Sequence, residues 1–481
     1  MNWNQLLSEQ RIVPCDVHRR PAAAFLLSEG GRETADLRTE FEKDYHRIVG
    51  SASFRRLQDK TQVFALDKSD FIRTRLTHSL EVSSFAKSLG QNISQHLLQT
   101  KKDRSFTIRD KEDICNILQC AGFIHDIGNP PFGHFGEEAI RDWFVRKLPE
   151  MKYQGKAVCE FLAPVMFQDL CHFEGNAQAL RQVSKLYFLE NEYGMNLTLG
   201  VLSAVIKYPV SSLKICPDGS DVKKKKMGYF YAEENLYRDI ARATGTNGER
   251  NPLAYILEAA DDIAYLTADI EDAFKKSFVS YDELVRELDC DYEENLRSGM
   301  DVASMLRQQY EHAKKGQVPN TQLYAVQNWI AGLQSALIFG VTDSFLLHYE
   351  EIMAGEFRKD LFQGTTAEWV VEALRRIAHK YAFSSRQILQ NEVSAWTILN
   401  FLLDRFVPAA LYYDTEVPMN MMEKKLMNLV SENYKQTYHT YSKGKSSAEK
   451  LYLRLLLITD FVSGMTDSYA KDLYQKLNGI S

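Results

Sequence analysis

One stretch constrains the fold of this chain most: an apolar helix that ends in a His-Asp pair. Apolar residues recur at helical spacing before the pair, at Ile114, Ile117, Leu118, Ala121 and Ile124. Asp110 is the expected N-cap of this helix. Residues 128–131 (Gly-Asn-Pro-Pro) end it, because Pro lacks an amide donor and disfavours a helical residue before it. His125 and Asp126 therefore lie on an apolar scaffold, where burial is costly unless they are paired or bind a metal.

Helical periodicity continues along the chain and predicts an all-α fold. Apolar residues follow the helical period in 76–93, 199–208, 252–266, 323–337, 367–378, 393–403 and 452–462. No clear strand alternation and no internal repeat accompany them. We expect three parts: an N-terminal surface segment (1–40), a catalytic core (41–280) and a C-terminal helical region packed on that core (281–481).

The composition is that of a soluble globular chain. Of 481 residues, 45% are hydrophobic and 25% are charged, which can bury one large core or two smaller ones. The net charge of -6 gives no overall field that attracts nucleic acid. No apolar segment reaches the ~18–20 residues of a membrane span, and the N-terminus lacks a signal-peptide pattern. Seven Cys without a C-x-x-C pair, from Cys15 to Cys290, favour reduced thiols. We expect a cytoplasmic protein without a membrane partner.

Four potential metal ligands lie on three predicted helices. His78 falls near a helix start, His125 and Asp126 at a helix end, and Asp261 on an apolar helix face. Each residue alone is weak evidence, since a lone His is more often capped or packed in a core. Together, two imidazoles and two carboxylates suit a divalent ion such as Mn²⁺, Fe²⁺ or Co²⁺.

Two basic stretches have more than one interpretation. Residues 40–64 are rich in Arg and Lys at helical spacing, which fits either a solvated face or an anion site. The four lysines at 223–226 are more typical of a solvated loop than of anion binding.

Several blocks of the sequence together resemble one known family. The main blocks are residues 54–64, 73–82, 125–137 and 258–265, with weaker matches at 172–176, 207–209 and 463–467. The order His, His-Asp, Asp resembles that of the HD-domain metal phosphohydrolases. The blocks together are similar to the deoxyguanosine triphosphate triphosphohydrolases. The resemblance implies an HD-type helical bundle core with additional C-terminal helices.

The resemblance also implies a reaction. A deoxynucleoside triphosphate, dGTP foremost, would be hydrolysed to the deoxynucleoside and inorganic triphosphate by water that attacks the α-phosphorus. His78, His125, Asp126 and Asp261 would hold a divalent metal, Mn²⁺ foremost, with Mg²⁺, Fe²⁺ and Co²⁺ as alternatives.

His134 and Glu137 are the expected catalytic pair. His134 would act as the general acid or base at the α-phosphate, and Glu137 would orient it and raise its basicity. The alternative is that Glu137 or Glu138 merely stabilises the N-terminus of the following helix.

The resemblance assigns the substrate contacts by position. Arg75, Lys207 and Tyr208 would contact the phosphates, and His172 and Asn176 would line the metal–phosphate end.

At the nucleoside end, Gln62 and Asp269 would bind the 3′-hydroxyl. Tyr265 would stack on the deoxyribose, and Val63 would touch the base. The residues that read the base, and therefore the base preference, stay open.

The family suggests a closed homo-oligomer, often a hexamer, and control by single-stranded DNA or a dNTP effector. Some related triphosphohydrolases carry a His where this chain has Asn129. Two other functions remain open: an HD-type phosphodiesterase or nucleotidase, and a catalytically idle regulator that senses nucleotides or single-stranded DNA. The long basic block before His78 argues against a monophosphate substrate, and the intact His134 and Glu137 argue against an idle protein.

Overall fold

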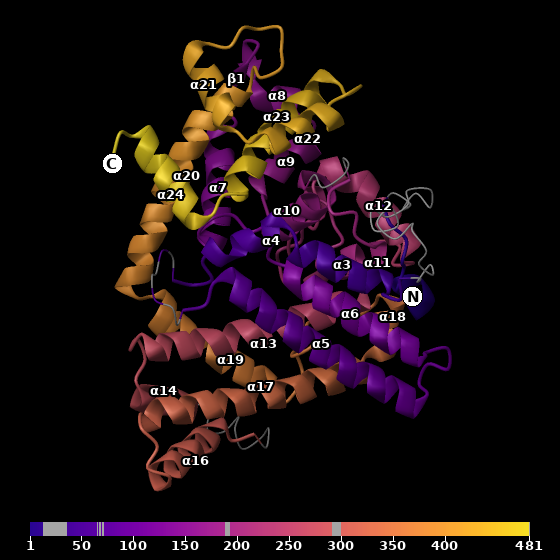
Figure 1. The fold of residues 1–481 in the computed structure, drawn as a ribbon, viewed down its shortest axis with the longest axis vertical. Coiled ribbons are helices and arrows are strands. Elements are labelled where there is room, and N and C mark those ends of the chain that lie inside the picture. The colour runs from indigo at the N-terminus through magenta and orange to yellow at the C-terminus, as the bar shows by residue number, and fades with distance from the viewer. Residues whose placement is uncertain are drawn as a thin grey trace, which may run out of the picture.

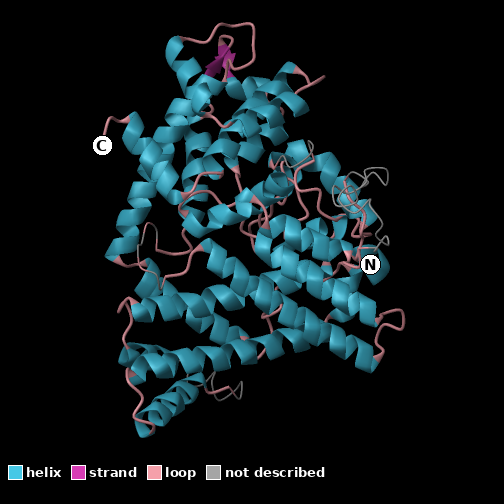
Figure 2. Cartoon of the chain, in the orientation of Figure 1, coloured by secondary structure: helices cyan, strands magenta, loops and turns pink. Residues whose placement is uncertain are grey.

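The computed structural model describes residues 1–12, 36–64, 66, 69, 72–187, 193–290 and 300–480. It confirms the all-α prediction, since the described chain is helical almost throughout (Figure 2). Its strands are one short antiparallel pair, β1 (Lys152–Tyr153) and β2 (Lys156–Ala157). Cys15 lies outside the described residues, and the other cysteines carry free thiols.

Two hydrophobic cores organise the helices, which Figure 1 shows as a lower and an upper part of the molecule. The helices of the first core are α1 (Trp3–Leu6), α3 (Glu40–Val49), α4 (Ala52–Arg56), α5 (Arg75–Thr100), α6 (Ile108–Ile124), α11 (Leu199–Val205), α12 (Glu234–Ala243), α13 (Pro252–Lys275), α14 (Tyr281–Asp289), α16 (Val302–Lys315), α17 (Thr321–Leu347), α18 (Tyr349–Ala354) and α19 (Glu368–Ile377). The helices of the second core are α7 (Gly133–Lys147), α8 (Val158–Phe161), α9 (Pro164–Cys171), α20 (Arg386–Ala410), α21 (Met421–Leu429), α22 (Glu432–Tyr441), α23 (Ser447–Ser463) and α24 (Asp467–Leu477). α10 (Gly175–Arg181) contributes to both.

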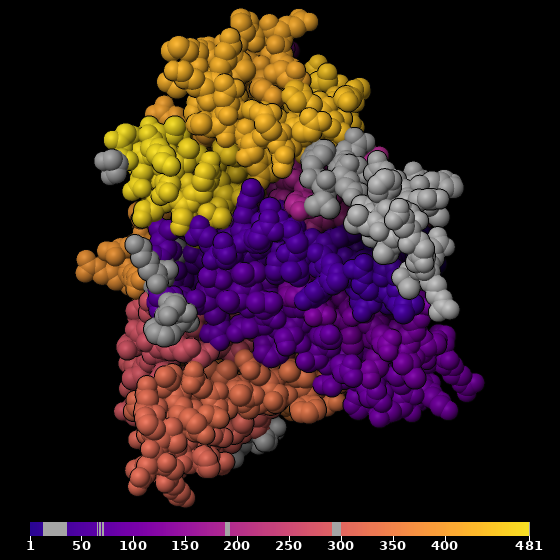
Figure 3. All heavy atoms as spheres, in the orientation of Figure 1, coloured from indigo at the N-terminus to yellow at the C-terminus, as the bar shows by residue number. Residues whose placement is uncertain are grey.

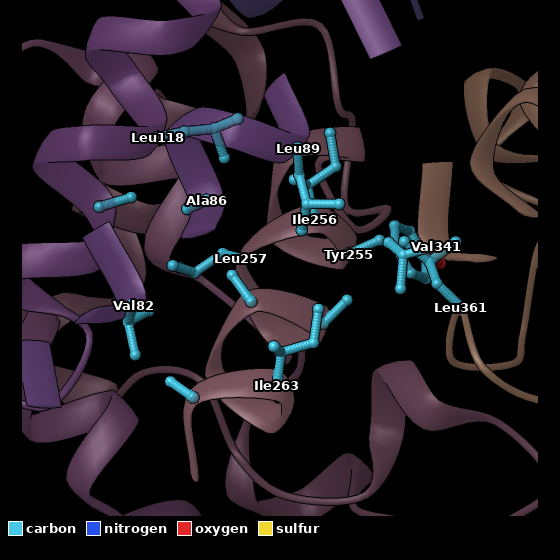
Figure 4. Close-up of a cluster of buried hydrophobic side chains, with 14 of the residues drawn as sticks. Val82, Ala86, Leu89, Leu118, Tyr255, Ile256, Leu257, Ile263, Val341 and Leu361 are labelled. Atoms are coloured by element: carbon cyan, nitrogen blue, oxygen red, sulfur yellow. The ribbon is translucent and has the colours of Figure 1, made fainter. Parts of the chain in front are cut away.

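Helix α13 lies at the centre of the first core. It packs against α5, α6, α11, α17 and α19. Figure 4 shows its Leu257 grouped with Val82 and Leu89 of α5 and Leu118 of α6. Pro252 occupies its first turn, where a missing amide costs nothing. A polar side chain in the middle of α13 is therefore carried into the interior of the protein.

The second core joins an early segment of the chain to its last helices. α20 packs against α7, α21, α23 and α24, and it runs along one side of the molecule toward α21 (Figure 1). The helices after α20 cover the upper face of the molecule, in orange and yellow (Figure 3). Both cores cross residue 280, because the first extends from Trp3 to Ala382 and the second from Phe132 to Leu473. The predicted boundary between 41–280 and 281–481 therefore does not separate the two hydrophobic cores.

The start of α6 corrects one sequence prediction. Thr107, rather than Asp110, is the N-cap of this helix. Its hydroxyl accepts a hydrogen bond from the amide of Asp110, whose carboxylate accepts one from the amide of Thr107 at 2.6 Å. Asp110 is the third helical residue, and its carboxylate completes a capping box. From the sequence alone, an Asp in this role is easily taken for the N-cap itself. The end of α6 is as expected, with Ile124 as its last residue and His125 as its C-cap.

Within the described chain, α17 alone is long and apolar enough to cross a membrane, judged by length and composition. It packs against α5, α13 and α16. Trp329, Leu333 and Leu337 on this helix are at most 1% exposed. One face of α17 is therefore packed in the first core, while 39% of its most apolar window is buried.

Candidate active site

Three side chains from three helices form a compact group of metal-type ligands. His78 comes from the start of α5, His125 from the end of α6, and Asp261 from the middle of α13. One potential ligand atom of each lies within 4.8 Å of the others. Asp261 Oδ1 is 3.1 Å from His78 Nε2 and 3.4 Å from His125 Nε2.

The hydrogen bonding of His125 fits a metal ligand. Its Nδ1 lies 2.7 Å from the carbonyl of Gly122. Since a carbonyl only accepts, Nδ1 carries the proton and Nε2 presents a lone pair. His125 Nε2 is buried and has no hydrogen-bond partner among the described residues. A buried lone pair beside a second imidazole and a carboxylate is what a divalent ion of intermediate hardness requires.

Asp126 lies beside this group. Its Oδ1 is 3.6 Å from His125 Nε2 and accepts a hydrogen bond from Asn129 Nδ2 at 2.7 Å. Its Oδ2 is paired with Arg75. Burial opposes ionisation, but the Arg75 guanidinium lowers the pKa of Asp126 below its usual value. Asp126 thus presents a carboxylate next to the ligand group, although it is not a member of the compact set of three.

The loop after the His-Asp pair turns sharply between α6 and α7. Gly128 is required there, since a Cβ at this position would lie 2.1 Å from the backbone nitrogen of Ala179. Phe132 and Gly133 both have a left-handed backbone, with φ of 64° and 62°. Glycine takes this conformation without strain, whereas Phe132 does not. The turn starts α7 at Gly133, so that His134 is on its first turn.

His134 and Glu137 form the pair that the sequence suggested. His134 Nδ1 lies 3.2 Å from Glu137 Oε2, and the other oxygen of Glu137 accepts the amide of Gly175 at 2.7 Å. Glu137 is buried, while 65% of the His134 side chain is exposed. The hydrogen bond to Glu137 raises the pKa of His134 above its ordinary value. The geometry is that of an imidazole held by a fixed carboxylate that favours its protonated form.

Apart from His125, the metal-type ligands, Asp126 and the His134–Glu137 pair line one cavity of 520 Å³. Eleven of the residues singled out from the sequence line it: Gln62, Arg75, His78, Asp126, His134, Glu137, Asn176, Lys207, Tyr208, Asp261 and Tyr265. Lys207 Nζ lies 2.7 Å from Asp261 Oδ2. The second oxygen of that carboxylate is thereby neutralised, while the first faces the histidines.

Four other predicted residues do not line this cavity. His125 is buried behind it, with 2% exposure. Asp269 is also buried, and burial raises its pKa well above the usual value. His172 ends α9, where its Nδ1 donates to the carbonyl of Gln168 at 3.0 Å. Val63 lines a smaller pocket that adjoins the cavity.

That smaller pocket is largely apolar. It shares Gln62, His134 and Tyr265 with the cavity. Its further lining includes Phe383, whose ring is parallel to that of Tyr265 at a centroid distance of 6.3 Å, and Glu392. Burial raises the pKa of Glu392. The arrangement offers aromatic surfaces and one carboxyl group beside the cavity, next to His134.

The cavity also contains cations that were not assigned from the sequence. Lys225 and Lys226 line it, together with Arg375 of α19. The interpretation of 223–226 as a solvated loop is wrong for Lys223, which is buried and paired with Glu249. Lys224 and Lys225 are exposed and Lys226 is half-buried. The lysine run was a signal in the sequence from which Lys225 and Lys226 could have been found. The sequence carried no such signal for Arg375, since only the fold brings α19 to α13.

Comparison with known proteins agrees with this geometry. Residues 75–200 match the HD domain family, a range that includes His78, the His-Asp pair, His134 and Glu137. A deoxyguanosinetriphosphate triphosphohydrolase-like protein of Listeria innocua serovar 6a is 46% identical over all of both chains, as is one of Listeria monocytogenes. The deoxyguanosinetriphosphate triphosphohydrolase of Yersinia pseudotuberculosis is 31% identical over 91% of this chain and 93% of its own. The chain therefore belongs to the deoxyguanosinetriphosphate triphosphohydrolase family and contains an HD domain.

Proposed function

We propose that this protein hydrolyses dGTP to deoxyguanosine and inorganic triphosphate with a bound divalent metal. The observation that carries the proposal is one cavity lined by His78 and Asp261, by the His134–Glu137 pair and by several cations, with His125 grouped with the first two. The names of the relatives support dGTP as the substrate.

His78, His125, Asp126 and Asp261 would hold the metal, with manganese as the first ion to test. A divalent metal in such a site polarises a phosphoryl oxygen and activates water at neutral pH. The two imidazoles and two carboxylates suit Mn²⁺, Fe²⁺ or Co²⁺ better than they suit Mg²⁺, which prefers oxygen ligands.

His134 would give a proton to the 5′-oxygen that leaves the α-phosphorus. An exposed imidazole with a raised pKa is well suited to donate a proton near neutral pH. Glu137, fixed by the amide of Gly175, would hold that imidazole in its charged form. Arg75 and Lys207 would neutralise the phosphates beside the carboxylates that they already contact.

The order of residues along α13 supports one orientation of the substrate. Tyr265, Asp261 and Glu258 line the cavity in that sequence, over a helical rise of about 10 Å. The nucleoside would lie at Tyr265, with Gln62 and Asp269 near the 3′-hydroxyl, and its base in the apolar pocket with Val63. The phosphates would extend past Asp261 toward Glu258, Tyr208 and Asn176.

We also propose a cytoplasmic homo-oligomer, with a hexamer as the first state to test. Free thiols in the described chain support a reducing compartment. Exposed apolar side chains such as Phe339 and Trp396 support self-association. Single-stranded DNA and dNTPs are the effectors to examine.

The test is to incubate the purified protein with Mn²⁺ and each of the four dNTPs, and to separate the products by anion-exchange chromatography. We expect deoxyguanosine and tripolyphosphate in equal amounts. His134→Ala and Asp261→Asn should abolish them, whereas the matched control His96→Ala, an exposed position on α5, should not. Release of orthophosphate or pyrophosphate, or cleavage of dGMP or a cyclic dinucleotide in place of dNTPs, would contradict the proposal.

A further inference from the structure

A second hollow, of 280 Å³, adjoins the catalytic cavity. The two share Val222, Lys225, Asp360 and Arg375 in their linings. We call it the distal hollow. Nothing in the proposed reaction of a triphosphate uses its outer wall, which includes Arg358 and Lys359.

The distal hollow lies at the end of the cavity that is remote from the nucleoside. Arg375 of α19 is 3.0 Å from Asp262 of α13, and Phe383, just beyond α19, lies against Tyr265. The chain from Arg375 to Phe383 therefore runs in the same direction as α13. Residues that precede Arg375 on α19, such as Val371, lie farther from Tyr265 and line the distal hollow. A chain of phosphates that passes Asp261 is thus directed toward this hollow.

The two walls of the distal hollow are held together by defined contacts. The amide of Val222 donates to the carbonyl of Arg358 at 3.0 Å. Lys223 Nζ donates to the carbonyl of Gly355 at 2.7 Å, and Tyr255 Oη donates to the carbonyl of Phe357 at 2.7 Å. The segment that carries Arg358 is therefore fixed beside the lysine run before any ligand binds.

The distal hollow presents cations that are free to contact an anion. Lys225, Arg358 and Lys359 form no ion pair with another residue of the described chain. Of the carboxylates in the lining, Asp360 accepts two backbone amides at 2.9 Å, and Glu368 accepts that of Gly364 at 2.8 Å. Both carboxylates are thus engaged by backbone amides of their own segment and keep their negative charge. Glu372 is the remaining carboxylate, and it is exposed to solvent.

We propose that the distal hollow is a subsite for a fourth phosphoryl group, so that the enzyme also hydrolyses deoxynucleoside 5′-tetraphosphates. The inference rests on the proposed function, from which it takes the orientation of the substrate. The bond changes are those of the triphosphate reaction. A water oxygen bonds to the α-phosphorus, the bond from that phosphorus to the 5′-oxygen breaks, and the 5′-oxygen takes a proton. The products are the deoxynucleoside and inorganic tetraphosphate, and no further reactant is needed.

The experiment compares deoxyguanosine 5′-tetraphosphate with dGTP as substrates of the full-length protein loaded with Mn²⁺. We expect kcat/KM for the tetraphosphate to be within about tenfold of that for dGTP. The double variant Arg358→Ala/Lys359→Ala should lower kcat/KM for the tetraphosphate by at least about tenfold, as expected for a lost charged contact. It should leave kcat/KM for dGTP within about twofold of that of the unchanged protein. The matched control Lys314→Ala/Lys315→Ala removes the same charge from the exposed end of α16. This control should change kcat/KM for the two substrates by the same factor.

Calorimetry with inorganic tripolyphosphate and tetrapolyphosphate separates this inference from the proposed function, because it needs no turnover. We expect tetrapolyphosphate to bind more tightly, and the Arg358→Ala/Lys359→Ala variant to remove that advantage. If dGTP is hydrolysed but the tetraphosphate is neither cleaved nor sensitive to this variant, the distal subsite is overturned and the proposed function stands. If no dNTP is hydrolysed, the proposed function fails. In that case the subsite is also overturned if the unchanged protein and the Arg358→Ala/Lys359→Ala variant each bind the two polyphosphates equally tightly.

Discussion

At the scale of single residues, the protonation of His134 depends on a carboxylate that is itself fixed. Glu137 shares its two oxygens between the imidazole and the amide of Gly175. Gly175 has to be glycine, because a Cβ there would lie 1.9 Å from Asn129 Oδ1 and 2.5 Å from Glu137 Oε1. A side chain at Gly175 would therefore displace the carboxylate that raises the pKa of His134.

Glu137→Gln should shift the pH dependence of kcat. The carboxylate raises the pKa of His134, so the imidazolium persists to higher pH and activity should fall as pH rises through that pKa. Without the carboxylate the pKa of His134 falls, and the decline should begin at lower pH. The optimum kcat should also drop by about 10²-fold or more. Rate profiles between about pH 5 and 9 measure both effects.

Glu138→Gln is the matched control, since Glu138 is exposed and one residue farther along α7. Its profile should follow that of the unchanged protein. If both variants gave the same profile, Glu137 would act only at the helix start, as the alternative interpretation of the sequence holds.

At the scale of elements, the turn between α6 and α7 is held by residues from both ends of the chain. Lys60 Nζ donates to the carbonyls of Asn129 at 2.5 Å and Ser463 at 2.7 Å. Asp467 accepts the amide of Phe132 at 2.9 Å and that of Thr61 at 3.0 Å. The left-handed backbone of Phe132 is therefore fixed by the first turn of α24.

Asp467→Asn should lower both stability and kcat. The side-chain NH₂ of Asn is a donor, so it cannot accept the hydrogen bond of the backbone N–H that faces it. A buried backbone N–H without an acceptor costs about 1–3 kcal/mol. A turn held less firmly should place His134 less well, so kcat should fall more than KM changes. Urea unfolding and steady-state kinetics measure the two effects. Asp472→Asn, at an exposed position of the same helix, should change neither. Equal kinetics for both variants would refute the positioning role.

The sequence predicted the helices and the His-Asp pair because both depend on local periodicity and on prolines. It left the basic residues of 40–64 open between a solvated face and an anion site, and neither describes the contacts of Arg56 and Lys60. Arg56 donates to Tyr434 Oη and to the carbonyl of Gly464, and Lys60 is buried. Contacts across hundreds of residues give no local signal, so the structural use of these cations could not be predicted.

At the scale of the whole molecule, a buried ionic network joins α10 to the second core. Arg181 donates from Nε and Nη2 to Asp460 at 2.7 Å, and from Nη1 to Glu233 at 2.8 Å. Lys185 Nζ is 3.0 Å from Glu233. Because α10 also contributes Leu180 to the first core, this network connects the two cores.

Arg181→Met should reduce the free energy of unfolding by about 3–5 kcal/mol, because it leaves Asp460 buried without its main partner. Arg242→Met, which breaks a surface pair on α12, should change it by no more than about 0.5 kcal/mol. Denaturant titration followed by circular dichroism measures both. Equal midpoints for the two variants would mean that the network does not stabilise the fold.

The bond between Asp467 and Phe132 also has a consequence during synthesis. The two residues are 335 positions apart, so at about 5–20 residues per second the ribosome needs roughly 20–70 s to reach the second after the first. Throughout that interval the growing polypeptide contains its His-Asp pair and His134 but lacks the carboxylate that fixes the turn between them. Nascent chains and truncated fragments should therefore spare the cell's nucleotides, and only a finished polypeptide should consume them.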